Sequence, residues 1–177
     1  MGRIIIIYGV IGGLIVAVGM LLGITFVSDH GVLGMVVGYL SMLVALSMVF
    51  MGVRSYRDTV GGGVIRFWPA FGLGLAIALV ACLFYVAMWE IYMWQTGYTF
   101  FNEYVAKAIA EMQAQGKPAA EIAAFSSEME AFKLQYAQPL FRMAITLSEI
   151  APVGLLVSLV SAALLRNSRI FPSRART

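Results

Sequence analysis

The sequence predicts an all-α fold, an integral membrane four-helix bundle with an extracytoplasmic helical hairpin between its third and fourth helices. Hydrophobic residues make up 61% of the 177 residues and charged residues 12%, with a mean hydropathy of +0.88, whereas about a quarter of the residues of soluble domains are charged. Four apolar runs are long enough to cross a bilayer, and arginines gather beside one end of these runs. The length predicts a single membrane domain over residues 1–177.

The first apolar run covers residues 4–27. A helix of this length reaches about 36 Å, which exceeds the ~30 Å of bilayer hydrocarbon. The run is too long for a secretory signal and no small-residue cleavage site follows it, so we expect it to be retained. Gly9 and Gly13, then Gly19 and Gly23, repeat at a spacing of four, which predicts close approach of a neighbouring helix.

The second run covers residues 32–53 and follows a short turn that contains His30. Because a metal site needs several ligands, this lone histidine indicates a solvated turn residue. Small residues share one face of the predicted helix, at steps of three, four or seven: Gly34, Gly38, Ser41, Ala45 and Gly52. We expect this face to pack against another helix.

A basic, glycine-rich turn follows, with Arg54, Arg57 and Arg66 around the glycines at 61–63. Arginines in short loops between membrane spans favour the cytoplasmic side. Two interpretations are open. The turn could be a topology signal alone, or its arginines and glycine amides could bind a phosphate or an anionic lipid headgroup.

The third run covers residues 67–94. Pro69 falls in its first turn, where the missing N–H costs little. Trp68 at one end and Trp94 at the other match the aromatic belts of a spanning helix. Gly74 and Ala78 form its small-residue face.

Residues 98–138 contain five glutamates and three lysines, and no part of them is apolar enough to span a membrane. Their pattern predicts two amphipathic helices separated at Gly116 and Pro118. The apolar stripes could pack on each other, rest on the membrane surface or receive a partner. One stripe holds Phe101, Val105, Ala108 and Met112, and the other holds Ile122, Phe125, Met129, Phe132 and Tyr136.

The fourth run covers residues 140–165 and a basic tail follows it. The arrangement predicts four spans with the N- and C-termini on the cytoplasmic side. Eight arginines then lie on the cytoplasmic side, and four basic residues lie opposite. The first set is Arg3, Arg54, Arg57, Arg66, Arg166, Arg169, Arg174 and Arg176, and the second is Lys107, Lys117, Lys133 and Arg142.

Two blocks of sequence resemble a known family. The first is Gly-Val-Arg-Ser-Tyr-Arg-Asp at 52–58 with the glycine run after it. The second is Gln-Pro-Leu-Phe at 138–141, which leads to Glu-Ile-Ala-Pro-Val-Gly-Leu at 149–155 and to Ser161 and Ala162. The chain resembles, over nearly its whole length, the bacterial membrane proteins grouped as domain of unknown function 4199. The resemblance implies four membrane helices and a helical insertion before the last one, in the inner membrane of a bacterium, and it implies no activity.

The candidate polar site is centred on Glu149. This residue lies sixteen positions before Leu165, about 24 Å along a helix, which is within the membrane. A charged group there is costly, so Glu149 should face the bundle and have a partner. Pro152 removes a backbone hydrogen bond one turn away. Glu90 is expected at a similar depth near the outer end of the third span, on the same helix as Tyr85 and Tyr92. Arg142 is expected to enter the membrane on the outer side.

Two interpretations of this site are open. Glu149 and Glu90 could form a protonatable pair that lines a small polar cavity open to the outside. Alternatively, both carboxylates could take Arg142 or tyrosine hydroxyls as partners and hold the third and fourth helices together.

The composition favours a non-enzymatic protein. A single histidine, a lone Cys82 in an apolar run and no cluster of metal ligands predict no catalytic site, no metal and no cofactor. We expect a structural or accessory subunit that associates, through small-residue helix faces and the outer hairpin, with a second copy or another membrane protein. The alternative is a small transporter or lipid-handling protein, with a bound lipid, that uses Glu149 and Glu90. The bilayer is an implied partner, and nucleic acid is not.

Overall fold

A computed structural model describes residues 1–26, 32–167 and 171–172. Within these residues the chain is all-helical and has no strand, which confirms the predicted fold class at this level. His30, Arg169, Arg174 and Arg176 lie outside the described residues. The helices are α1 (Gly2–Phe26), α2 (Val32–Thr59), α3 (Phe67–Gln95), α4 (Phe100–Ala114), α5 (Ala119–Tyr136) and α6 (Pro139–Leu165).

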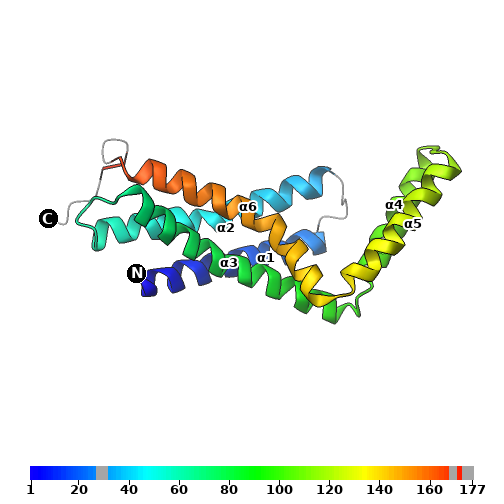
Figure 1. Cartoon of the computed structure of the whole chain (residues 1–177), viewed down its shortest axis with the longest axis horizontal. Helices are drawn as coiled ribbons and strands as arrows, with labels where there is room; N and C mark the ends of the chain where they lie inside the picture. Colours follow the sequence, from blue (N-terminus) through cyan, green and yellow to red (C-terminus); the bar gives the residue numbers. More distant parts are fainter. Residues whose placement is uncertain (27–31, 168–170, 173–177) are drawn as a thin grey trace. The chain divides into compact units, whose positions relative to one another are not determined.

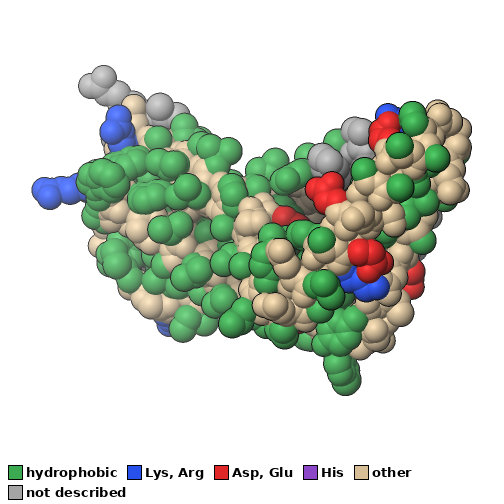
Figure 2. Space-filling view, turned by 45° about the vertical axis from the view of Figure 1, so that its right-hand side comes forward, with side chains coloured by type: hydrophobic (Ala, Val, Ile, Leu, Met, Phe, Trp, Pro, Cys, Tyr) green, Lys and Arg blue, Asp and Glu red, His purple; other side chains and the backbone are tan. Residues whose placement is uncertain are grey.

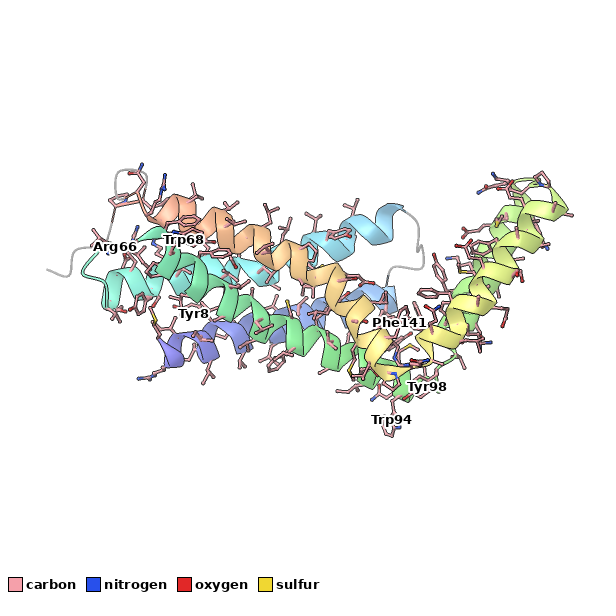
Figure 3. The ribbon with its side chains drawn as sticks, viewed as in Figure 1. Tyr8, Arg66, Trp68, Trp94, Tyr98 and Phe141 are labelled. Carbon is pink, nitrogen blue, oxygen red and sulfur yellow. The ribbon has the colours of Figure 1, made fainter. Side chains whose placement is uncertain are left out.

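Four of these helices, α1, α2, α3 and α6, are long and apolar enough to cross a membrane, as predicted. In the face shown in Figure 2, apolar side chains are spread over the surface; Lys and Arg side chains lie near the left-hand end and also, beside Asp and Glu side chains, in the right-hand part. Trp68 and Trp94 lie near opposite ends of α3 and are 74% and 71% exposed (Figure 3). Exposed tryptophans at helix ends are typical of membrane interfaces.

α2 is longer than its apolar run and ends at Thr59. Arg54 and Arg57 therefore lie in its last turns, whereas the sequence placed them in the connecting turn. Nothing between Val53 and Thr59 breaks a helix, and the hydroxyl of Thr59 donates to the carbonyl of Ser55 at 2.7 Å. The glycines at 61–63 end the helix, because Gly62 and Gly63 adopt positive φ angles of 62° and 91° that disfavour other residues.

The chain divides into two compact units, residues 1–87 with 147–177 and residues 88–146. In the first unit, α1, α2, α3 and α6 share one buried apolar core, to which they contribute Val16, Leu46, Ile77 and Ile150 respectively. Figure 1 shows the start of α1, the end of α2, the start of α3 and the end of α6 at the same end of this unit. The prediction of one membrane domain stays a prediction.

Glycines let the helices of the first unit approach closely. A Cβ added at Gly9 would lie 2.6 Å from Cβ of Val80, and one at Gly13 would lie 2.5 Å from Cγ of Phe84. Real Cβ atoms essentially never come so close, so α1 can pack on α3 at this distance only with glycine at both positions. A Cβ added at Gly19 would make a tight contact with Cβ of Ser41 on α2 at 3.0 Å, whereas one at Gly23 would have no described neighbour within 4 Å.

The second unit contains α4 and α5, which have no fully buried residue. Their two predicted apolar stripes are half-buried throughout. The ring of Phe101 on α4 stacks on Phe132 and Tyr136 of α5, with centroids 5.7 and 5.5 Å apart. The stripes thus contact each other, which was one of the three arrangements left open.

Candidate polar sites and family

Glu149 is exposed on α6, one turn before Pro152, which lies inside the helix. The hydroxyl of Tyr85 on α3 donates a hydrogen bond to Oε2 of Glu149 at 3.2 Å. At the membrane depth expected for this residue, a charged carboxylate is costly. The tyrosine hydroxyl offsets part of that cost.

A pocket of about 290 Å³ opens beside this carboxylate. Gly38, Tyr39 and Met42 of α2 line it together with Tyr85 and Glu149. Gly38 contributes to the opening because a Cβ added there would meet no heavy atom of the described residues within 4 Å. The pocket can hold water or a small ligand group next to a carboxylate and two phenols.

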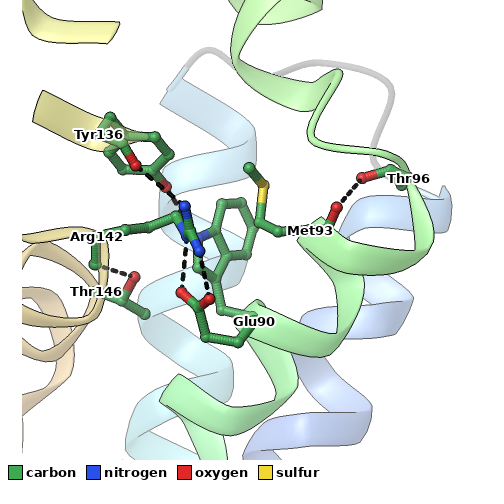
Figure 4. A network of polar contacts seen from close by, with 7 residues as sticks. Glu90, Met93, Thr96, Tyr136, Arg142 and Thr146 are labelled. Atoms are coloured by element: carbon green, nitrogen blue, oxygen red, sulfur yellow. Dashed lines mark hydrogen bonds and ion pairs between the residues drawn. The ribbon is translucent and has the colours of Figure 1, made fainter. Parts of the chain in front are cut away.

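Glu90 and Arg142 form an ion pair in the second unit (Figure 4). Nε and Nη2 of Arg142 donate to the two carboxylate oxygens of Glu90 at 2.8 and 2.5 Å. Nη1 of Arg142 donates to the carbonyl of Tyr136 at 3.1 Å. Arg142 is 2% exposed. Bidentate contact between a buried guanidinium and a carboxylate fixes the orientation of both groups.

Aromatic rings surround this ion pair. The guanidinium carbon of Arg142 lies 5.1 Å from the ring centroid of Tyr98 and 5.9 Å from that of Tyr136. Trp89 donates from its indole nitrogen to the hydroxyl of Tyr136 at 2.9 Å. Cation–π contacts of this kind favour a charged guanidinium.

The predicted site residues are therefore distributed over two separate sets of contacts. Glu149 and Tyr85 belong to the first unit, and Glu90 and Arg142 belong to the second. Tyr92 contacts the rings of Trp89 and Phe100 and takes no part in either site. Each carboxylate has a partner of its own, as the structural interpretation expects. The paired-carboxylate interpretation stays a prediction.

Arg57 is fully buried at the end of α2. Its Nε donates to Oδ1 of Asp58 at 2.7 Å, and its Nη1 donates to the carbonyl of Phe171 at 2.7 Å. Its Nη2 has no hydrogen-bond partner in the described part of the chain. The ring of Phe171 packs edge-on against Phe50, with centroids 5.4 Å apart. Phe171 is thus attached to α2 by a hydrogen bond and a ring contact.

The suggested anion site at this turn is only partly available. The amides of Gly61 and Gly63 already donate to the carbonyls of Tyr56 and Arg57. Arg54 lies 3.7 Å from the carboxylate of Asp58, and Arg66 is exposed. The role of Arg54, Arg57 and Arg66 in binding an anionic lipid or phosphate stays a prediction.

Most of the small residues predicted for helix packing are used within the chain itself. Ala45 and Ala78 are buried in the shared core. A Cβ at Gly74 would lie 3.2 Å from Val49 and 3.3 Å from Ser158. Only Gly38 faces open space, and Ser41 beside it donates to the Gly38 carbonyl at 2.7 Å. The surroundings of Gly34 lie outside what the structure describes.

The contacts that were not predicted include the one between Arg57 and Phe171 and the one between Arg142 and Tyr98. No spacing rule joins residues 57 and 171. The contact of Tyr98 with Arg142 depends on the φ angle of 62° at Tyr98, and nothing in the sequence predicts a positive φ for a tyrosine. Gly97 beside it predicts only that α3 ends there.

Comparisons with known proteins give one match. The family model described as "Protein of unknown function (DUF4199)" matches residues 7–167. Searches of curated proteins and of solved structures find no match. The matched region contains all four long apolar helices almost entirely, together with α4 and α5. The chain therefore belongs to the DUF4199 family of proteins of unknown function.

Proposed function

We propose that this membrane protein is a non-enzymatic accessory subunit of the bacterial inner membrane. In this proposal α1, α2, α3 and α6 form a four-helix bundle with both termini in the cytoplasm. The α4–α5 pair is an extracytoplasmic hairpin available to a partner. The subunit binds a second copy or another membrane protein through an open face of α2.

The distribution of arginines supports this orientation. Arg3, Arg54 and Arg66 lie at or next to the helix ends that Figure 1 shows together at one end of the first unit. Basic residues at the ends of spans favour the cytoplasmic side. The three lysines of residues 98–138 are far apart in a long connection, where basic residues influence the orientation less than they do in short loops.

The observation that carries the proposal is the open face of α2 around Gly38. Most of the described glycines in the helices of the first unit are in close contact with neighbouring helices, namely Gly9, Gly12, Gly13, Gly19, Gly52, Gly74 and Gly154. Gly38, like Gly23 and Gly72, has no described neighbour within 4 Å of its Cβ position, and it lines the pocket beside Glu149. An apolar groove of about 450 Å³ lies nearby, lined by Gly19 and Ser41 among others. Small residues beside an open groove allow the backbone of a further helix to approach.

Substituting Gly38 tests this interface. We expect Gly38→Leu to dissociate the assembly, because the leucine side chain would occupy the space of the docking helix. Gly72→Leu is the matched control, since Gly72 is also a helical glycine with open space around its Cβ position. Size-exclusion chromatography and native mass spectrometry in mild detergent measure the assembly. A Gly38→Leu protein with the assembly state of the parent would contradict the proposed interface.

The second candidate function is a small transporter or lipid-handling protein. The pocket beside Glu149 favours this function, because it could hold water or a substrate group next to a carboxylate that we expect to lie within the membrane. Four helices are few for alternating access, so this function would need an oligomer.

The variant Glu149→Gln separates the two functions, because it keeps the size and hydrogen bonding of the side chain and removes its charge. Its assembly is measured as for Gly38→Leu, and its transport is measured in liposomes. The accessory-subunit proposal expects this variant to keep the assembly and thermal stability of the parent and to show no change in pH-dependent flux in liposomes. Loss of such a flux in Glu149→Gln, with the assembly intact, would favour the transporter.

A further inference from the structure

We propose that the second unit binds an anionic lipid headgroup in a pocket beside Arg142. The pocket has a volume of about 310 Å³ and is formed by residues of α4 and α5, the end of α3, the start of α6 and the turns between them. This ligand site is distinct in its residues from the Glu149 pocket and does not depend on the proposed function.

The walls of the pocket are aromatic. Tyr98, Phe101 and Tyr136 line it, and the ring of Phe101 stacks on that of Tyr136. Rings at the edge of a membrane pack well against the glycerol and upper acyl region of a lipid, because they have an apolar body and, in tyrosine, a polar tip. The walls therefore suit an amphiphile better than a bare ion.

The pocket contains hydrogen-bond donors that are not fully used. Arg142 has five N–H groups, and three of them donate to Glu90 and Tyr136. The remaining two have no acceptor among the described residues. The ammonium of Lys133 lines the same pocket and likewise has no ion pair or acceptor in the described chain. The amide of Asn102 adds a third donor group.

The charge of the pocket selects an anion. Glu90 neutralises Arg142, so Lys133 leaves the lining with a net charge of about +1. A phosphate diester carries one negative charge and several acceptor oxygens. It would therefore match both the charge and the unused N–H groups.

The backbone at Tyr98 is strained in a way that serves this pocket. Tyr98 has φ of 62°, a conformation that is unusual for a bulky residue. Strain of this kind gathers at ligand sites. The conformation puts the Tyr98 ring over the guanidinium of Arg142 and in the wall of the pocket.

The position of the pocket in the chain indicates a lipid as the source of the anion. The candidate membrane spans end at Gln95 and begin again at Pro139. Met93 and Pro139, which both line the pocket, are within two residues of these limits. A site at the ends of two spans lies at the depth of lipid headgroups.

A binding titration tests the site. Purified full-length protein in detergent is titrated with short-chain phosphatidylglycerol, with phosphatidylcholine of the same chain length and with inorganic phosphate. Tryptophan fluorescence reports binding, because Trp89 donates to Tyr136 in the pocket wall. We expect phosphatidylglycerol to bind about tenfold or more tightly than either other probe, as loss of a charged hydrogen bond or of the apolar contact predicts.

Lys133→Gln should weaken binding of phosphatidylglycerol about tenfold. Lys117→Gln is the matched control, because Lys117 is exposed, paired with Glu121 and outside the pocket. Tyr98→Gly removes the ring and relieves the backbone, so it should keep the melting temperature close to that of the parent and still weaken binding. Equal affinity of Lys133→Gln and Lys117→Gln would overturn the site. Phosphate binding as tight as that of the lipid would overturn the assignment to a lipid.

Discussion

Arg142→Met is expected to lower the free energy of unfolding by about 3–5 kcal/mol, because it leaves Glu90 as an uncompensated charge in a largely buried position. Arg142 is 2% exposed and makes three hydrogen bonds, two of them to Glu90. Titration with SDS in mixed micelles, followed by circular dichroism, measures the change.

The double variant Glu90→Met with Arg142→Met should lower the free energy of unfolding less than Arg142→Met alone does, since it removes both charges. Lys117→Met is the control for removal of a lysine from an exposed ion pair, which is worth about 0–1 kcal/mol. Its partner Glu121 lies 2.9 Å away in a solvated position. If Arg142→Met lowers the free energy of unfolding no more than Lys117→Met does, the ion pair with Glu90 does not stabilise the second unit.

Gly13→Leu is expected to destabilise the first unit by about 1–3 kcal/mol or more, because it overpacks the contact between α1 and α3. Even the Cβ atom would lie 2.5 Å from the ring of Phe84, and a ring cannot move aside as the end of a flexible chain can. The melting temperature in detergent measures this effect.

Gly72→Leu again provides the control, because its added side chain meets open space in a helix of the same unit. Equal melting temperatures for Gly13→Leu and Gly72→Leu would show that α1 does not pack on α3 through this glycine. Gly9→Leu should behave like Gly13→Leu, since its Cβ would lie 2.6 Å from that of Val80.

The sequence predicted the all-helical class and the four apolar helices because both depend on local composition. A run of apolar residues as long as residues 4–27 has few alternatives to a membrane helix. The end of α2 was predicted wrongly because hydropathy falls at Arg54, whereas helical hydrogen bonding continues to Thr59. A helix can therefore continue beyond the end of its apolar run, as α2 does.

Partners across long sequence distances could be proposed from the sequence but not assigned. Arg142 was a candidate partner for both Glu149 and Glu90, and the structure pairs it with Glu90, 52 residues away. Tyr85 bonds Glu149 across 64 residues. Such pairs depend on the rotation of each helix in its packing, which hydropathy does not specify.

The direct test of the membrane topology is the labelling of single cysteines with a membrane-impermeant maleimide, in a Cys82→Ser background. Val64→Cys, at an exposed position between α2 and α3, should react only after the membrane is opened, and Gln115→Cys, between α4 and α5, should react in intact spheroplasts. Labelling of both positions from the same side would contradict four spans with cytoplasmic termini.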